Sequence, residues 1–74
     1  MLQNLDKKSN EYIERSFNFK NCDDGIIGFE AFGRDEWVKF FNDGKASYSK
    51  SGKIADVIDF ENYQDCVDFI MIKQ

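Results

Sequence analysis

Hydrophobic and polar residues alternate in the first half of this chain, and alternation is the pattern of a half-buried β-strand. Over residues 12–20, YIERSFNFK, the side chains of Ile13, Phe17 and Phe19 fall on one side of an extended chain, together with Arg15. The pattern predicts a strand over residues 12–20. A helix that begins near the N-terminus and continues to Arg15 is the competing interpretation of the same residues.

A turn and a second alternating segment follow. The cluster NCDDG at 21–25 ends in glycine and predicts a turn. Residues 26–32, IIGFEAF, then place Ile27, Phe29 and Ala31 on one side, which predicts a second strand.

The segment EWVKFFNDGKASYSK at residues 36–50 predicts a β-hairpin. Its turn, NDG, fits a type I turn followed by a glycine in the left-handed region, Gly44. A two-residue DG loop shifts the register and sets Phe40 against Ser47. The three-residue connection pairs apolar with apolar and acid with base, so we expect that register. It sets Phe41 opposite Lys45, Phe40 opposite Ala46, Val38 opposite Tyr48 and Glu36 opposite Lys50.

This register divides the hairpin into two faces. We expect Val38, Phe40, Ala46 and Tyr48 on the core side. The other side then carries two aromatic residues, Trp37 and Phe41, which we expect to be covered by the first residues of the chain or by a second copy, because isolated exposed aromatics are unfavourable. Beside them on this side lie Lys39, Lys45, Ser47 and Ser49.

The last third of the chain predicts a short strand and a helix. Residues 54–58, IADVI, predict the strand, and Asp59 is expected to cap a helix that starts at Phe60. Residues 66–72 could instead end as a strand, because Phe69 and Ile72 interrupt the apolar face. One face of the helix is apolar (Tyr63, Cys66, Val67, Ile70, Met71), and the opposite one is acidic (Glu61, Asp65, Asp68).

Together these segments predict an α+β fold: a small antiparallel sheet of about four strands, connected as a meander, with the C-terminal helix packed on one face. Residues 1–74 are expected to form a single small domain, with 1–10 loose or forming a short N-terminal helix. The composition is 42% hydrophobic and 16% aromatic, which is typical of a folded chain.

The residue types argue against an enzyme. The chain contains no histidine, so the usual proton shuttle near neutral pH is missing. The sequence places no candidate base beside Ser47, Ser49 or Ser51, and acyl transfer requires one. Cys22 and Cys66 match no zinc or redox spacing. We therefore expect no catalytic residues, no metal site and no cofactor.

The chain shows no signal-peptide pattern and no apolar run long enough to span a membrane. We therefore expect a cytoplasmic protein with reduced thiols and no membrane partner.

Charge is distributed unevenly along the chain. Residues 37–53 hold four lysines and one acid, whereas residues 54–72 hold five acids and no base. The net charge is −4, which repels nucleic acid and favours a protein partner with a basic surface. We expect that partner to bind an acidic face made of Asp56, Glu61, Asp65 and Asp68.

In size and charge the chain is similar to small acidic phage-encoded inhibitors such as anti-CRISPR or antirestriction proteins, although no motif supports this. The sequence therefore predicts a non-enzymatic inhibitor that blocks a nucleic-acid-handling protein. Two other functions are compatible with the sequence. One is a nucleic-acid-binding module, because aromatic residues flanked by lysines suit single strands; the other is a structural or regulatory homodimer. The alternative binding face consists of Trp37, Lys39, Phe41, Lys45 and Lys50.

Overall fold

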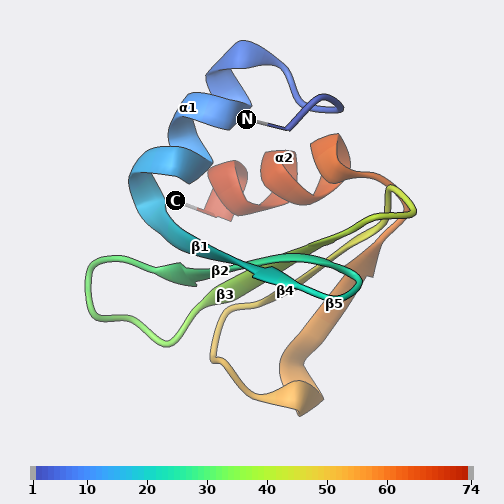
Figure 1. Cartoon of the computed structure of the whole chain (residues 1–74). Coiled ribbons are helices and arrows are strands. Elements are labelled where there is room, and N and C mark those ends of the chain that lie inside the picture. Colours follow the sequence, from blue (N-terminus) through green and yellow to red (C-terminus); the bar gives the residue numbers. More distant parts are fainter. Residues whose placement is uncertain (1, 74) are drawn as a thin grey trace.

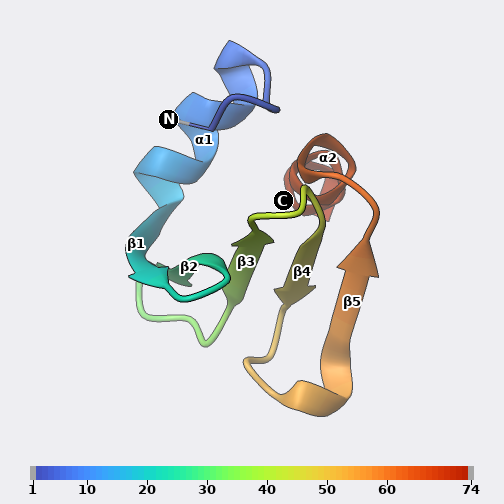
Figure 2. The same cartoon turned by 45° about the vertical axis from the view of Figure 1, so that its right-hand side comes forward.

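The computed structural model describes residues 2–73 and shows two helices packed on one face of a five-stranded antiparallel sheet (Figures 1 and 2). Neighbouring strands in the sequence are neighbours in the sheet, so the connectivity is a meander. The predicted α+β meander with a C-terminal helix is confirmed; its five strands correspond to the five strand segments expected from the sequence, although the expected total was about four. The elements are α1 (Lys7–Ser16), β1 (Phe17–Cys22), β2 (Gly25–Glu30), β3 (Trp37–Phe41), β4 (Ala46–Ser49), a 3-10 turn η1 (Ile54–Asp56), β5 (Val57–Phe60) and α2 (Tyr63–Lys73).

Helix α1 occupies a segment that we predicted as a strand. The prediction over 12–20 is wrong for residues 12–16, which are helical, and correct from Phe17 onward. The helix begins at Asp6, whose carboxylate accepts a hydrogen bond from the backbone N–H of Ser9 at 2.8 Å. Buried side chains recur every fourth residue from the helix into β1: Leu5, Ser9, Ile13 and Phe17.

The predicted hairpin and its register are confirmed over the paired residues of the two strands, whereas Glu36, expected opposite Lys50, forms an ion pair with Arg34 at 3.2 Å. Trp37 pairs with Ser49, Val38 with Tyr48 and Phe40 with Ala46. In the turn, Gly44 has a φ of 96°, the left-handed conformation that the three-residue connection requires.

The C-terminal third differs from the sequence prediction in where its helix starts. Asp59 does not cap a helix, because it lies in β5. The cap is Asn62, whose side-chain oxygen accepts the backbone N–H of Asp65 at 2.8 Å. From there α2 continues to Lys73, so residues 66–72 are helical and do not form a strand. Residues 54–56 form the 3-10 turn, so the predicted strand over 54–58 starts only at Val57.

The core lies between the two helices and one face of the sheet, which we call the covered face. Directly paired residues point to the same side of an antiparallel sheet, so Val38, Phe40, Ala46 and Tyr48 share this face as predicted, and each is at most 2% exposed. Helix α2 contributes the apolar face that the sequence indicated, with Cys66, Val67 and Ile70 fully buried. Gly28 also lies here, because a Cβ atom at this position would sit 2.5 Å from the ring of Phe19.

The opposite face of the sheet, the open face, lies away from both helices (Figure 2). It carries the alternate residues of the same strands, including Ile27, Phe29, Trp37 and Phe41. No helix in the part of the chain that the structure describes is long and apolar enough to cross a membrane.

Candidate functional site

An apolar strip runs along the middle of the open face. Phe29 pairs with Trp37 across β2 and β3, while Ile27 and Phe41 lie further along the same two strands. Phe29 is 44% exposed, and the other three side chains are half-buried. Adjacent accessible apolar side chains of this kind mark interaction surfaces on soluble proteins.

Two lysines lie over the aromatic rings of this strip. The Lys20 Nζ atom is 5.4 Å from the centre of the Phe29 ring, and the Lys39 Nζ atom is 4.8 Å from that of Phe41. Lys39 also forms an ion pair with Asp24 at 2.8 Å. Their hydrogen bond raises the pKa of Lys39 and lowers that of Asp24. The charge of Lys39 is therefore already engaged within the protein.

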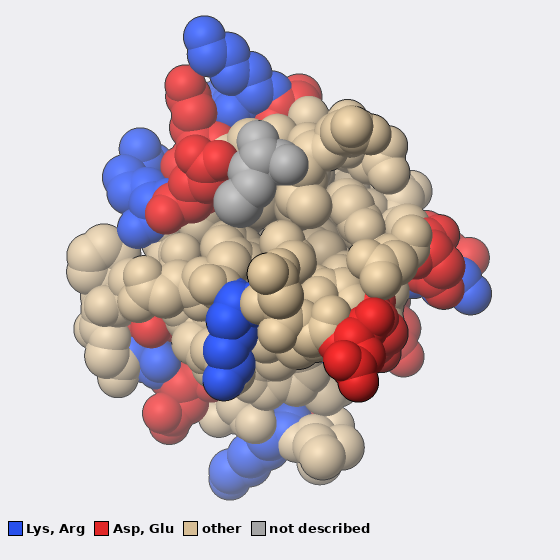
Figure 3. Space-filling view, in the orientation of Figure 1, with Lys and Arg blue, Asp and Glu red and all other residues tan. Residues whose placement is uncertain are grey.

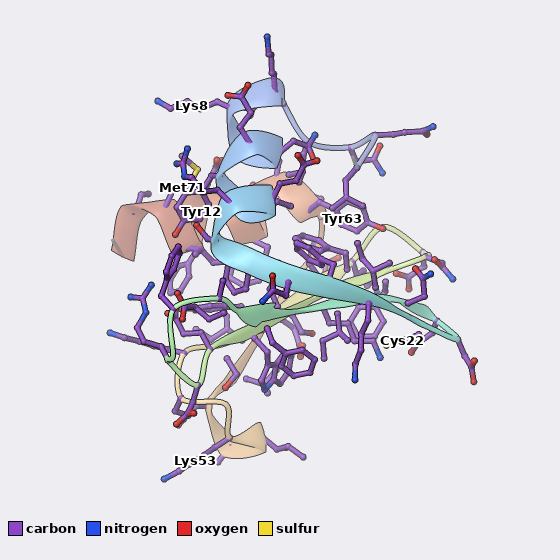
Figure 4. The ribbon with its side chains drawn as sticks, turned by 60° about the vertical axis from the view of Figure 1, so that its left-hand side comes forward. Lys8, Tyr12, Cys22, Lys53, Tyr63 and Met71 are labelled. Atoms are coloured by element: carbon purple, nitrogen blue, oxygen red, sulfur yellow. The ribbon has the colours of Figure 1, made fainter. Side chains whose placement is uncertain are left out.

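One end of the open face is closed by the loop between β4 and β5. The indole Nε1–H of Trp37 donates to the carbonyl of Gly52 at 3.1 Å, and the Ser49 hydroxyl donates to that of Lys53 at 3.0 Å. Figure 4 shows Lys53 on the side of the sheet away from the helices. The loop explains why Trp37 is half-buried. Helix α1 lies on the covered face, so the expectation that the N-terminal residues cover Trp37 and Phe41 is wrong.

The other end of the open face contains a groove of about 340 Å³, which we call the Phe41 groove. Tyr63 lies in the first turn of α2 (Figure 4). Its hydroxyl donates to the carbonyl of Phe41 and fixes the end of β3. In Figure 3, acidic side chains gather at the right of the view, near the β3–β4 turn and the start of α2. The groove is lined by Phe41, Asp43, Lys45, Ala46, Ser47, Asp59, Phe60 and Glu61.

Three carboxylates and one ammonium group line the Phe41 groove. The Asp59 carboxylate accepts a hydrogen bond from the Ser47 hydroxyl at 2.7 Å, and the Asp43 carboxylate accepts one from the backbone N–H of Lys45 at 3.0 Å. Glu61 lies on the bend before α2 and is exposed. With three acids and one lysine, the groove carries a formal charge of −2.

The acidic face predicted from the sequence is only partly assembled. Glu61 precedes α2, so only Asp65 and Asp68 lie on the helix. Both are exposed and bonded to neighbours, Asp65 to the side-chain amide of Asn62 at 3.2 Å and Asp68 to that of Gln64 at 2.9 Å. Asp56 lies in η1, before β5, and accepts the Ser51 hydroxyl. Glu61 therefore belongs to the Phe41 groove, and Asp56 is separated from it by the length of β5.

The alternative face predicted from the hairpin is also split. Trp37, Lys39 and Phe41 share the open face, and Lys45 follows at the Phe41 groove. Lys50 lies beyond the opposite end of β4, so it does not extend this surface.

Sequence reasoning missed a buried polar cluster on the covered face. The side chains of Glu30 and Glu36 are 1% and 5% exposed, and Arg34 bridges them at 3.0 and 3.2 Å. The Tyr48 hydroxyl donates to Glu36, and its pKa is raised by burial and then by that carboxylate. The signal in the sequence was that Glu30 falls on the same side of the strand as Ile26 and Gly28. It also lies four residues before Arg34.

The Glu30 carboxylate stabilises the loop between β2 and β3. It accepts the backbone N–H groups of Phe32 at 2.8 Å and Arg34 at 3.0 Å, in addition to the guanidinium. Burial raises the pKa of Glu30, but the hydrogen bonds from Arg34 and Phe32 outweigh it and leave this pKa lowered. Glu30 and Glu36 thus have partners within the fold, and their arrangement is structural.

The cysteines and serines that the sequence singles out lie at separate places in the described part of the chain. Burial raises the pKa of the Cys66 thiol to about 12, and Cys22 is exposed at the end of β1. The Ser47 hydroxyl donates to the carboxylate of Asp59, and the Ser51 hydroxyl donates to that of Asp56. The sequence did not predict these two hydrogen bonds. Within residues 2–73, no three His, Cys, Asp or Glu side chains are grouped so that they could hold a metal ion.

Comparisons with protein-family models, with curated proteins and with solved structures found no match for this chain.

Proposed function

We propose that this protein is a non-enzymatic binding protein that docks a protein partner on the open face of its sheet. The observation that supports this proposal is the placement of both helices on one face, which leaves Ile27, Phe29, Trp37 and Phe41 on the other. Exposed aromatic side chains anchor protein interfaces, because they remove large areas from water at a small loss of side-chain entropy.

The charges on the open face favour a protein with a basic surface over a nucleic acid. Nucleic-acid binding depends on clustered Lys and Arg that displace counterions, but Lys39 is paired with Asp24 and the Phe41 groove is negative. The net charge of −4 extends this repulsion of phosphate over the whole molecule.

Within this class, we propose that the partner is a protein that handles nucleic acid and that binding competes with its normal ligand. Such proteins present basic grooves, and an acidic protein with accessible aromatic side chains complements them. An inhibitor of the anti-CRISPR or antirestriction type is the most specific form of this proposal, and the acidity and small size of the chain support it.

The proposal is tested by capture from the native host with two matched variants. Phe29→Asp places a charge on the open face at a side chain that is 44% exposed, and Ile72→Asp does the same on α2 at one that is 84% exposed. A protein captured by the wild type and by Ile72→Asp but lost with Phe29→Asp supports docking on the open face. Circular dichroism checks that both variants remain folded.

Three outcomes contradict the proposal. Capture that survives Phe29→Asp removes the open face as the docking surface. Capture abolished by nuclease treatment shows that nucleic acid is the ligand. Twice the monomer mass in light scattering of the protein alone, lost with Phe29→Asp, shows that a second copy covers the face.

A further inference from the structure

The Phe41 groove combines apolar walls with a negative rim. Phe41, Phe60 and Ala46 are the apolar residues that line it. Phe41 points to the open face, whereas Ala46 and Phe60 pair with each other and share the covered face. The carboxylates of Asp43, Asp59 and Glu61 supply the negative charge. A ligand that fits both parts has an aliphatic or planar body and a cationic end.

The aromatic wall of the groove already holds a cation within the protein itself. The ammonium group of Lys39 lies 4.8 Å from the centre of the Phe41 ring, which is the geometry of a cation–π contact. The neighbouring carboxylate of Asp59 uses one oxygen for the Ser47 hydroxyl. An ionised carboxylate can accept several hydrogen bonds, so Asp59 can also accept a donor from a ligand.

From this geometry, and resting on the proposed function above, we infer that the Phe41 groove receives an arginine side chain of the partner protein. A guanidinium group suits this site because it stacks on aromatic rings and donates in a planar fork to carboxylates. The volume of about 340 Å³ lies within the range of pockets that hold organic groups.

The position of the groove links it to the rest of the open face. Phe41 follows Lys39 and Trp37 on β3, and Asp59 is next to Ser47 across β4 and β5. An arginine in the groove therefore anchors one end of a partner whose apolar side chains contact Ile27 and Phe29.

The inference is tested by titrating the intact protein with three short blocked peptides and recording its amide NMR spectrum. The peptides are Gly-Arg-Gly, its citrulline analogue, which has the same shape without the charge, and Gly-Glu-Gly. We expect the arginine peptide to shift the resonances of residues 41–47 and 59–61 saturably. We expect the citrulline peptide to bind at least about tenfold more weakly, since loss of one charged hydrogen bond is of that order.

Two double variants remove the same charge at different places. Asp59→Asn with Glu61→Gln neutralises the groove and is expected to weaken the arginine peptide at least about tenfold. Asp65→Asn with Asp68→Asn neutralises two acids of α2 outside the groove and is expected to leave its affinity within twofold. Equal shifts from the citrulline peptide, or equal losses in the two double variants, overturn the inference.

The peptide titration and the capture experiment can fail separately. If the groove binds the arginine peptide but Phe29→Asp still captures the partner, the open-face proposal fails and the groove inference stands. If Phe29→Asp loses the partner but the arginine peptide does not bind, the inference fails alone.

Discussion

The two faces of the sheet are built from the same kinds of residue, aromatic and acidic, but those residues have different surroundings. On the covered face, Phe40 and Tyr48 are at most 2% exposed, and the carboxylate of Glu30 accepts hydrogen bonds from within the protein. On the open face, Phe29 is 44% exposed. Glu61, at the rim of the Phe41 groove, is exposed as well.

The difference shows that composition alone does not separate residues that have partners inside the fold from residues that are accessible on the surface. A buried carboxylate must be paired, because desolvation of an isolated charge is unfavourable. Glu30 meets this requirement through Arg34 and the backbone. The acids of the Phe41 groove are not under this constraint, since water solvates them, and a partner can replace that water.

The largest expected effect is a loss of unfolding free energy when core packing on the covered face is removed. Ile70→Ala removes a fully buried side chain of α2 from the covered face, and we expect about 2–5 kcal/mol less unfolding free energy. Ile72→Ala, two residues later at 84% exposure, is expected to change it by less than about 0.5 kcal/mol. Urea denaturation measures both. Similar losses in the two variants would show that α2 does not pack as described.

A smaller loss is expected from the polar part of the covered face. Tyr48→Phe keeps the ring and removes the hydroxyl that donates to Glu36, so the buried carboxylate loses one partner. We expect a decrease of about 1–3 kcal/mol in unfolding free energy. Ser51→Ala removes an exposed hydrogen bond to Asp56 and is the matched control, with an expected change under about 0.5 kcal/mol. An unaffected Tyr48→Phe would mean that Glu36 is satisfied without Tyr48.

The parts of the fold that local chemistry determines were predictable from the sequence. The β3–β4 register followed from one turn type and from matching apolar neighbours, and a shift of one residue reverses every side chain. The apolar face of α2 was predictable because five apolar residues repeat at helical spacing. The α1 segment was ambiguous because Ile13 and Phe17 are four residues apart, a spacing that suits both a strand and a helix. Arg15 was the discriminating residue, since a strand places it on the core side and the helix leaves it exposed.

The candidate site was harder to predict, because it depends on which of two residues caps α2. Asp59 and Asn62 are both favourable caps. With Asp59 as the cap, Glu61 joins the acids of the helix. With Asn62 as the cap, Asp59 lies in β5 and Glu61 follows that strand, and both line the groove together with Phe41. The choice is made by pairing of β5 with β4, a tertiary contact that no local pattern in the sequence encodes.

The smallest expected effect concerns the response of the covered face to acid. The pKa of Glu30 is lowered in the folded protein because its hydrogen bonds from Arg34 and Phe32 outweigh burial. A lowered folded pKa gives stability that is present above the unfolded value, about 4.3, and lost as the pH falls through the folded value. Asp6 and Asp24 act in the same direction, through the N–H of Ser9 and through Lys39 respectively.

We therefore expect the wild type to lose stability progressively below about pH 5. Glu30→Gln should make this loss shallower, because one of the carboxyl groups that take up protons on unfolding is removed. Glu11→Gln, an equal change of charge on the exposed side of α1, should retain the wild-type slope. Urea midpoints between pH 7 and pH 3 measure the difference. Parallel curves for Glu30→Gln and the wild type would show that Glu30 titrates alike in the folded and unfolded chains, and the contrast between satisfied and accessible carboxylates would not hold.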